Sequence, residues 1–180
     1  LPGHPNMHEL PGIETNTGAL GHGLSIAGGM ALGLKMDGIG SKVYVIMGDG
    51  ELAEGSNWEA AAATSHYKLD NLLLFVDRNT LQISGRTVDV MNYEPLDKRW
   101  ESFGWSVREI NGHDLQQIVE NASRVPFEKG KPSVIIANTI KSKGLSFAED
   151  KAEYHYWKVK EEELQIAEKD LAELERRIGQ

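Results

Sequence analysis

The chain has 180 residues, of which 40% are hydrophobic, and its formal net charge is −8. This length and apolar content are sufficient for one domain with a substantial core. The acidic balance argues against non-specific binding to nucleic acid or to an anionic membrane, because both need a basic surface. No cysteine is present, which excludes disulfides and is compatible with the cytoplasmic location that we expect. No apolar stretch approaches the roughly 20 residues that a membrane-spanning helix needs.

Short apolar runs alternate with helical patterns through most of the chain. In order, the sequence predicts a helix over residues 20–36, a strand over 43–47, a helix over 56–67, a strand over 72–77, a helix over 95–103, a strand over 105–110, a helix over 114–125 and a strand over 133–139. Continuously apolar strands are typical of strands that are covered on both faces. The alternation indicates an α/β fold, with a doubly wound, mostly parallel sheet flanked by helices. We assign residues 1–150 to this domain.

The C-terminal part of the chain has a different pattern. We assign residues 151–180 to a charged, amphipathic segment, with a helix over 158–178. The apolar residues of this helix form a stripe along one side, and such a stripe usually faces an apolar surface. We expect it to pack on its own domain; the alternatives are a linker and a contact with a partner. Its apolar residues lie three and four positions apart and are Leu164, Ala167, Leu171, Leu174 and Ile178.

Polar turns follow the first two predicted strands. Asp49 lies in the turn Gly48-Asp49-Gly50, and Asn79 lies thirty positions later in the second turn. One strand-helix-strand crossover of this length brings two such turns to the same edge of a parallel sheet. A carboxylate, an amide oxygen and a nearby carbonyl are too few ligands for a hard cation, but a phosphorylated ligand would complete them. The spacing therefore predicts a metal-diphosphate site.

Structural explanations stand beside these functional ones. Asp49 alone is equally well explained as a helix cap, although the spacing to Asn79 favours a shared site. The glycine-rich segment 17–23 is followed by a helix of small residues, and close helix packing explains it as well as ligand binding does. Glu54, at the start of the next predicted helix, is well placed simply to favour the helix dipole.

The residues around the two turns carry a more specific signal. The stretch GDGELAEGSNWEAAAATSHYKLDNLLLFVDRNTLQISG, from Gly48 to Gly85, resembles the thiamine diphosphate signature, and its details resemble the transketolase family. The segments GHP, ELPGIETNTGALGHGLSIAGGMALGLKMDG, FGW, INGHD and TIKSKGLSF resemble the same family. The resemblance covers nearly the whole chain, and it implies the diphosphate-binding domain without its first portion.

The resemblance implies a magnesium or calcium ion and a diphosphate at the two turns. The side chains of Asp49 and Asn79 and the backbone carbonyl of Leu81 match the metal ligands of the family. The positions that match its diphosphate-cradling turn are Gly48, Gly50 and Glu51.

The resemblance also implies residues around the rest of the cofactor. Gly18 and Leu20 match backbone positions on the aminopyrimidine side. His4 and His155 resemble histidines that face cofactor and substrate, although the surroundings of His155 match less closely. Glu54 matches a buried carboxylate that couples paired active sites across the dimer.

The implied activity is the transfer of a two-carbon ketol unit from a ketose phosphate to an aldose phosphate by means of thiamine diphosphate. The glutamate that activates the aminopyrimidine belongs to a pyrimidine-binding domain, which nothing here matches. The chain, which starts at Leu1 without an initiator Met, is then a fragment or the small subunit of a split enzyme. It would act only with a pyrimidine-binding partner, as a dimer of diphosphate domains within a heterotetramer. The alternatives are another thiamine diphosphate enzyme, such as deoxyxylulose-phosphate synthase, and a non-catalytic interaction subunit.

Overall fold

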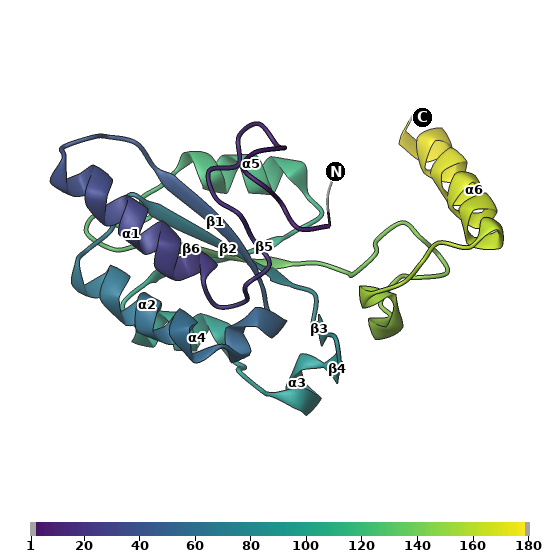
Figure 1. Ribbon diagram of the computed structural model, residues 1–180, viewed down its shortest axis with the longest axis horizontal. Coiled ribbons are helices and arrows are strands. Elements are labelled where there is room, and N and C mark those ends of the chain that lie inside the picture. Colours follow the sequence, from purple (N-terminus) through teal and green to yellow (C-terminus); the bar gives the residue numbers. More distant parts are fainter. Residues whose placement is uncertain (1–2, 179–180) are drawn as a thin grey trace.

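A computed structural model of the chain describes residues 3–178 (Figure 1). Every predicted helix and strand is present, with ends that differ by at most three residues. The helices are α1 (Gly23–Met36), α2 (Gly55–His66), α3 (Thr87–Val90), α4 (Leu96–Ser102), α5 (Leu115–Ser123) and α6 (Glu161–Ile178), with 3-10 turns η1 (Gly50–Ala53) and η2 (Ala152–His155). The strands are β1 (Val43–Gly48), β2 (Leu72–Arg78), β3 (Leu81–Gln82), β4 (Gly85–Arg86), β5 (Ser106–Asn111) and β6 (Ser133–Asn138).

The four long strands form one parallel sheet in the order β1-β2-β6-β5. The chain runs outward from β1 through β2 to β5, and then returns to insert β6 between β2 and β5. Helices α2 and α4 lie in the outward connections and α5 lies in the return, so the helices occupy both faces (Figure 1). Gly48 pairs with Asp77, and Arg78 pairs with Asn138, so these strands end at one edge. The predicted doubly wound α/β fold is confirmed.

Two apolar cores lie on the two faces of this sheet. The larger core packs α1, α2 and α4 against one face, and the smaller core packs α5 against the other. Three tryptophans pack together in the larger core: the ring centroid of Trp100 lies 5.1 Å from that of Trp58, in a tilted pair, and 4.9 Å from that of Trp105, in an edge-to-face pair. Aromatic pairs at such separations stabilise a core beyond the apolar area that they bury. These cores hold the strand ends, and the turns that follow them, in fixed positions.

The outer strand β1 is an exception to the predicted burial. Its side chains alternate between covered and exposed, and Ile46 is 75% exposed. The core under α5 draws on β2, β5 and β6, and α5 does not reach β1. Coverage of both faces is therefore confirmed for β2 and β6 and wrong for the edge strands β1 and β5, since most side chains of β5 are only partly covered and Glu109 is exposed.

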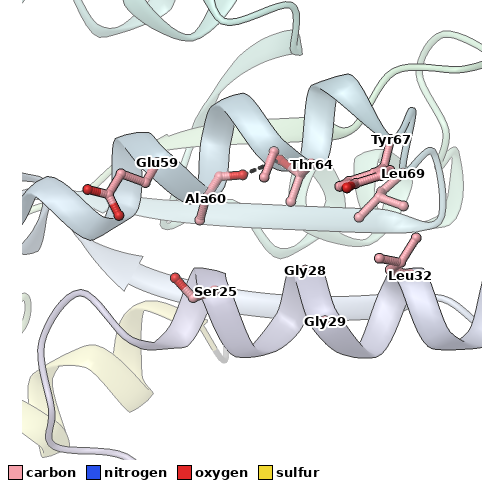
Figure 2. A pocket seen from close by; sticks show the side chains of 10 residues that line it. Ser25, Gly28, Gly29, Leu32, Glu59, Ala60, Thr64, Tyr67 and Leu69 are labelled. Carbon is pink, nitrogen blue, oxygen red and sulfur yellow. Dashed lines mark hydrogen bonds between the residues drawn. The ribbon is translucent and has the colours of Figure 1, made fainter.

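The small-residue helix α1 packs closely on α2, as Figure 2 shows. A side chain at Gly28 would place its Cβ 2.9 Å from the Thr64 methyl carbon, which is closer than real Cβ contacts. The Thr64 hydroxyl is turned back to donate to the Ala60 carbonyl at 2.8 Å. Close helix packing therefore does account for part of the glycine-rich region.

Helix α6 stands apart from the layers in Figure 1. It is attached to the short loop before η2, where the Ser146 N–H donates to the Asp170 carboxylate at 2.8 Å and Leu174 lies against Gly144, and to η2, where the Tyr154 hydroxyl lies 3.4 Å from Glu163 Oε1. Most of the predicted stripe is uncovered, with Leu171 57% exposed, and the side chain of Ile178 lies outside the described residues. The expectation that this stripe packs on its own domain is therefore wrong for most of its length. Within residues 3–178, no helix combines the length and the apolar character needed to cross a membrane.

Candidate cofactor and metal site

Asp49 joins the two polar turns at the carboxyl edge of the sheet. It follows β1, is only 6% exposed, and accepts at Oδ1 from the Gly50 N–H at 2.9 Å. Its Oδ2 accepts from the N–H of Thr80, in the turn after β2, at 2.7 Å. The prediction that Asp49 is a helix cap is therefore confirmed, because its side chain caps η1. The carboxylate also spans the thirty-residue crossover, as the shared-site prediction requires.

Burial changes the acidity of this carboxyl group. Desolvation raises the pKa of Asp49 to about 6, the negative charge of Asp77 adds to the rise, and the N–H groups of Thr80 and Gly50 oppose it. A carboxylate in this position is short of positive charge. A bound cation would supply that charge and favour the ionised form.

Asn79 directly precedes Thr80, the residue of the second turn whose N–H donates to Asp49. The Oδ1 of Asn79 accepts from the Leu81 N–H at 3.0 Å, and its Nδ2 lies 3.5 Å from an Asp77 oxygen. Thr80, between Asn79 and Leu81, has a φ of +63°, which is unusual for a β-branched residue and turns the backbone sharply. Carboxylate, amide and backbone oxygens are the donors that a hard cation prefers. The residues present therefore fit a magnesium or calcium ion.

The described residues offer few side-chain ligands for a cation at the two turns. Within residues 3–178 there is no cluster of three or more His, Cys, Asp or Glu side chains that could hold a metal ion. A cation between Asp49 and Asn79 would need oxygens from a ligand to fill its shell, and a diphosphate supplies them.

The N-terminal loop is fastened onto the turn after β1. The Gly21 N–H donates to Glu51 Oε1 at 2.9 Å, and the Ser56 hydroxyl donates to the Gly21 carbonyl at 2.7 Å. A Cβ at Gly21 would lie 2.5 Å from that hydroxyl and 2.6 Å from the Glu54 Cβ, and φ is +78°. Only glycine fits this contact, so the glycine-rich loop and the acidic turn form one structure.

Two predicted residues meet further along this loop. The ring of His4 lies against Gly18, where a Cβ would be 3.1 Å from His4 Cδ2. Leu20 is exposed, and its carbonyl lies 3.0 Å from His22 Nδ1. His4, Gly18 and Leu20 therefore belong to the same surface loop that Gly21 joins to Glu51.

Glu54 is at the start of α2, where its side chain makes no capping hydrogen bond and is exposed. This differs from the buried carboxylate that the resemblance implies. An exposed Glu54 beside Gly21 is buried only if another surface covers it.

His155 lies in η2, which contacts β3 and thus the segment that begins at Leu81. Partial burial lowers the pKa of His155, and the nearby charge of Lys141 acts in the same direction. No hydrogen bond among the described residues joins His155 to His4 or to Asp49.

Sequence reasoning missed a layer of polar residues behind the site. Asp77 accepts a hydrogen bond from the Thr139 hydroxyl, across the edge of the sheet. The Arg78 guanidinium donates to Glu94 at 2.6 Å and to the Asn138 amide oxygen at 2.8 Å. Their position at strand ends was a usable signal, since Asp77 and Arg78 directly precede Asn79. Their partners were not predictable, because they lie on other strands or in a distant loop.

Comparisons with known proteins agree with this geometry. The family model described as "Transketolase, thiamine diphosphate binding domain" matches residues 1–174. The chain is 49% identical over 171 residues to an apulose-4-phosphate transketolase subunit of Actinobacillus succinogenes, which covers 95% of this chain and 62% of that protein. It is 44% identical over 176 residues to 6-deoxy-6-sulfo-D-fructose transketolase subunit SqwG of Clostridium sp., covering 98% of this chain and 63% of that protein.

Solved transketolase structures are also similar to this chain. A transketolase from Campylobacter jejuni superposes with a TM-score of 0.81 at 34% identity, over 88% of this chain and 26% of that chain. The chain thus spans less than two thirds of the two curated relatives and about a quarter of this solved structure.

Proposed function

Because this chain belongs to the transketolase family and matches its thiamine diphosphate-binding domain, we propose that it forms the diphosphate half of a ketol-transferring active site. The observation that carries this proposal is the contact of 2.7 Å between the Asp49 carboxylate and the Thr80 N–H. It joins the turns that hold Asp49 and Asn79 at the sheet edge where α/β proteins bind ligands. The proposed reaction moves a two-carbon ketol unit from a ketose phosphate to an aldose phosphate.

The roles proposed for the two turns follow from their chemistry. Asp49, Asn79 and the carbonyl of Leu81 would hold a magnesium or calcium ion, and the ion would bind the diphosphate. The turn of Gly48, Gly50 and Glu51 would hold the diphosphate, because glycine lets the backbone come close to phosphate oxygens. Bound thiamine diphosphate supplies the carbanion chemistry of the reaction.

The other proposed residues surround the reacting end of the site. His4 lies on Gly18 in the loop that we assign to the aminopyrimidine side, together with Leu20. His4 and His155 would take up and return protons of substrate hydroxyl groups. The lowered pKa of His155 favours the neutral ring, which is the form that accepts a proton.

We propose that the active assembly contains a second chain. Both curated relatives are called subunits in their names, which supports a split enzyme. A pyrimidine-binding partner would supply the missing half, and two diphosphate domains would meet in a cytoplasmic heterotetramer. The exposed position of Glu54 supports this assembly, since a second diphosphate domain would cover it.

The experiment is reconstitution with the pyrimidine-binding partner. We expect sugar-phosphate ketol transfer that depends on both Mg²⁺ and thiamine diphosphate, and only in the mixture. Turnover by this chain alone would contradict the proposal, and a pyruvate donor in place of a ketose phosphate would indicate the synthase alternative. The assay measures product formed from labelled acceptor.

Substitution of Asp49 tests the metal site within the same mixture. We expect Asp49→Ala to weaken cofactor binding by roughly 100-fold or more, because changes to groups behind the ligands alone cost about 10- to 100-fold in metal sites. Asp37→Ala, at the exposed C-terminal end of α1, is the matched control and should bind normally. Calorimetric titration with thiamine diphosphate and Mg²⁺ measures both. Equal affinities in the two variants would remove Asp49 from the site.

A further inference from the structure

Arg86, at the end of β4, connects two segments that are far apart in the sequence. One guanidinium nitrogen donates to the Thr80 hydroxyl at 2.9 Å and to Asp150 Oδ1 at 2.8 Å. The other donates to Asp150 Oδ2 at 2.6 Å. The planar fork therefore holds both oxygens of one carboxylate and a hydroxyl at the same time, a geometry that lysine cannot reproduce.

At one end, Arg86 fixes the turn of the proposed metal ligands. Thr80 is held at three points: its N–H donates to Asp49, its carbonyl accepts from Thr87 at 3.0 Å, and its hydroxyl accepts from Arg86. These contacts hold Thr80 in the left-handed conformation that a β-branched residue otherwise avoids. Thr80, to which the guanidinium donates, is the sequence neighbour of both Asn79 and Leu81.

At the other end, Arg86 fixes the start of the segment that carries His155. Asp150 has a φ of +59°, and its N–H donates to the Lys141 carbonyl at 3.0 Å. The chain then enters η2, which ends at His155 and contacts β3. Asp150 therefore ties the start of this segment to the body of the protein, in addition to the contact of η2 with β3.

The ion pair is too exposed to be explained by stability. The side chains of Arg86 and Asp150 are 41% and 48% exposed. Exposed ion pairs add little to the free energy of unfolding. What the three hydrogen bonds supply is a defined distance and direction between the Thr80 turn and the Asp150 segment.

We propose that Arg86 is a positioning residue that fastens the segment 150–157 to the turn 79–81, so that His155 is held over the cofactor-metal site. The fastening itself is independent of the ligand; the purpose assigned to it rests on the proposed function. Its removal leaves the segment attached only through η2 and the loop before it.

Amide hydrogen exchange of the full chain without cofactor tests the fastening. We expect Arg86→Lys to speed exchange in residues 150–157 by about tenfold, the order of one charged hydrogen bond. Arg177→Lys, which alters another exposed arginine-carboxylate pair on α6, is the control and should leave this segment unchanged. Unchanged exchange of residues 150–157 in Arg86→Lys, or an equal effect of Arg177→Lys, would overturn the proposal.

A second arm separates this proposal from the function on which it rests. Addition of Mg²⁺ and thiamine diphosphate to the assembled complex should slow exchange in residues 79–82, and absence of that effect counts against the proposed function alone. In the complex, we expect Arg86→Lys to lower turnover at saturating cofactor. In a complex that already carries His155→Ala, adding Arg86→Lys should lower turnover no further. Fully additive losses would show that Arg86 does not act through His155.

Discussion

At the residue scale, Asp49 shows how one side chain serves both the fold and the site. Its carboxylate accepts from Gly50 and from Thr80, and so it closes the turn after β1 and attaches the turn after β2. Both contacts are made by a group that is almost completely removed from water. Burial of a carboxylate without a cation is unfavourable, since two N–H groups replace only part of its hydration. The protein without metal is therefore destabilised at this residue.

The raised pKa of Asp49 predicts how that destabilisation depends on pH. Since the pKa is about 6 in the folded protein and 3.8 as the unperturbed value, the folded state binds the proton more tightly than the unfolded state. The stability contributed by this group is therefore present below about pH 4 and is lost as the pH rises through 6. In EDTA at pH 8, Asp49→Asn should raise the free energy of unfolding by about 1–2 kcal/mol. This is less than the free energy equivalent to the whole pKa shift, because the amide has only one acceptor oxygen for the two N–H groups that the carboxylate binds.

Urea denaturation between pH 4 and pH 8 measures this effect. Asp70→Asn is the control, because burial at Asp70 is outweighed by Lys35 and by the Gly130 N–H, and the pKa of Asp70 is lowered. The stability that the Asp70 carboxylate contributes is present above pH 4 and is lost as the pH falls. Asp70→Asn should therefore be less stable to urea than the unchanged protein at neutral pH. The same sign of change in both variants at pH 8 would contradict the assignment.

At the scale of the elements, the close approach of α1 to α2 positions the N-terminal loop. Helix α1 follows directly from the loop of Gly18 and Gly21, and α2 follows directly from the acidic turn. The hydrogen bonds of Gly21 to Glu51 and Ser56 require the two helix starts to lie side by side. The absence of a side chain at Gly28 allows this, because Thr64 fills the space. The glycines of the loop and of the helix thus serve the same contact.

Two neighbouring glycines of α1 offer a matched test of this packing. A Cβ at Gly28 would lie 2.9 Å from Thr64, whereas a Cβ at Gly29 would have nothing within 4 Å. Gly29→Ala should raise the free energy of unfolding by up to about 1 kcal/mol, the difference in helix propensity. Gly28→Ala has the same propensity gain but should be about 1–3 kcal/mol less stable than Gly29→Ala, because of overpacking. Urea denaturation of both variants measures the difference, and equal stabilities would show that the helices can separate freely.

At the scale of the whole molecule, the sheet and its helices form one compact unit and α6 does not join it. The two apolar cores use residues from β1, β2, β5 and β6 and from α1, α2, α4 and α5. Helix α6 contacts the loop around Gly144 and Ser146, while most of its apolar stripe remains uncovered. Its charges suit an isolated helix, with Glu161, Glu162 and Glu163 in the first turn and arginines in the last. The stability of the sheet should therefore not depend on α6.

Removal of α6 tests this separation. A chain that ends at Lys160 should keep its thermal midpoint within about 2 °C, because little buried apolar area is lost from the cores. Trp100→Ala should instead destabilise the full chain by about 3–5 kcal/mol, since Trp100 is fully buried in the larger core. Circular dichroism melting measures both changes. A large loss of midpoint in the shortened chain would mean that the stripe of α6 packs on the sheet in solution.

The sequence by itself determined the elements and the pairing of the two turns. Hydrophobic periodicity and turn residues are local properties, and the thirty positions between Asp49 and Asn79 match one crossover. The short elements between Leu81 and Val90 were not predicted, because runs of two to four residues carry no periodicity.

Only the tertiary structure decided which groups meet across the sheet edge and which surfaces stay uncovered. The contact of Asp49 with Thr80, the joining of Arg86 to Asp150, and the exposure of Ile46 and α6 all depend on strand order and on where the helices lie. The physical reason is that a hydrogen bond between residues 64 positions apart leaves no local pattern, and an apolar stripe indicates burial without indicating the surface that covers it.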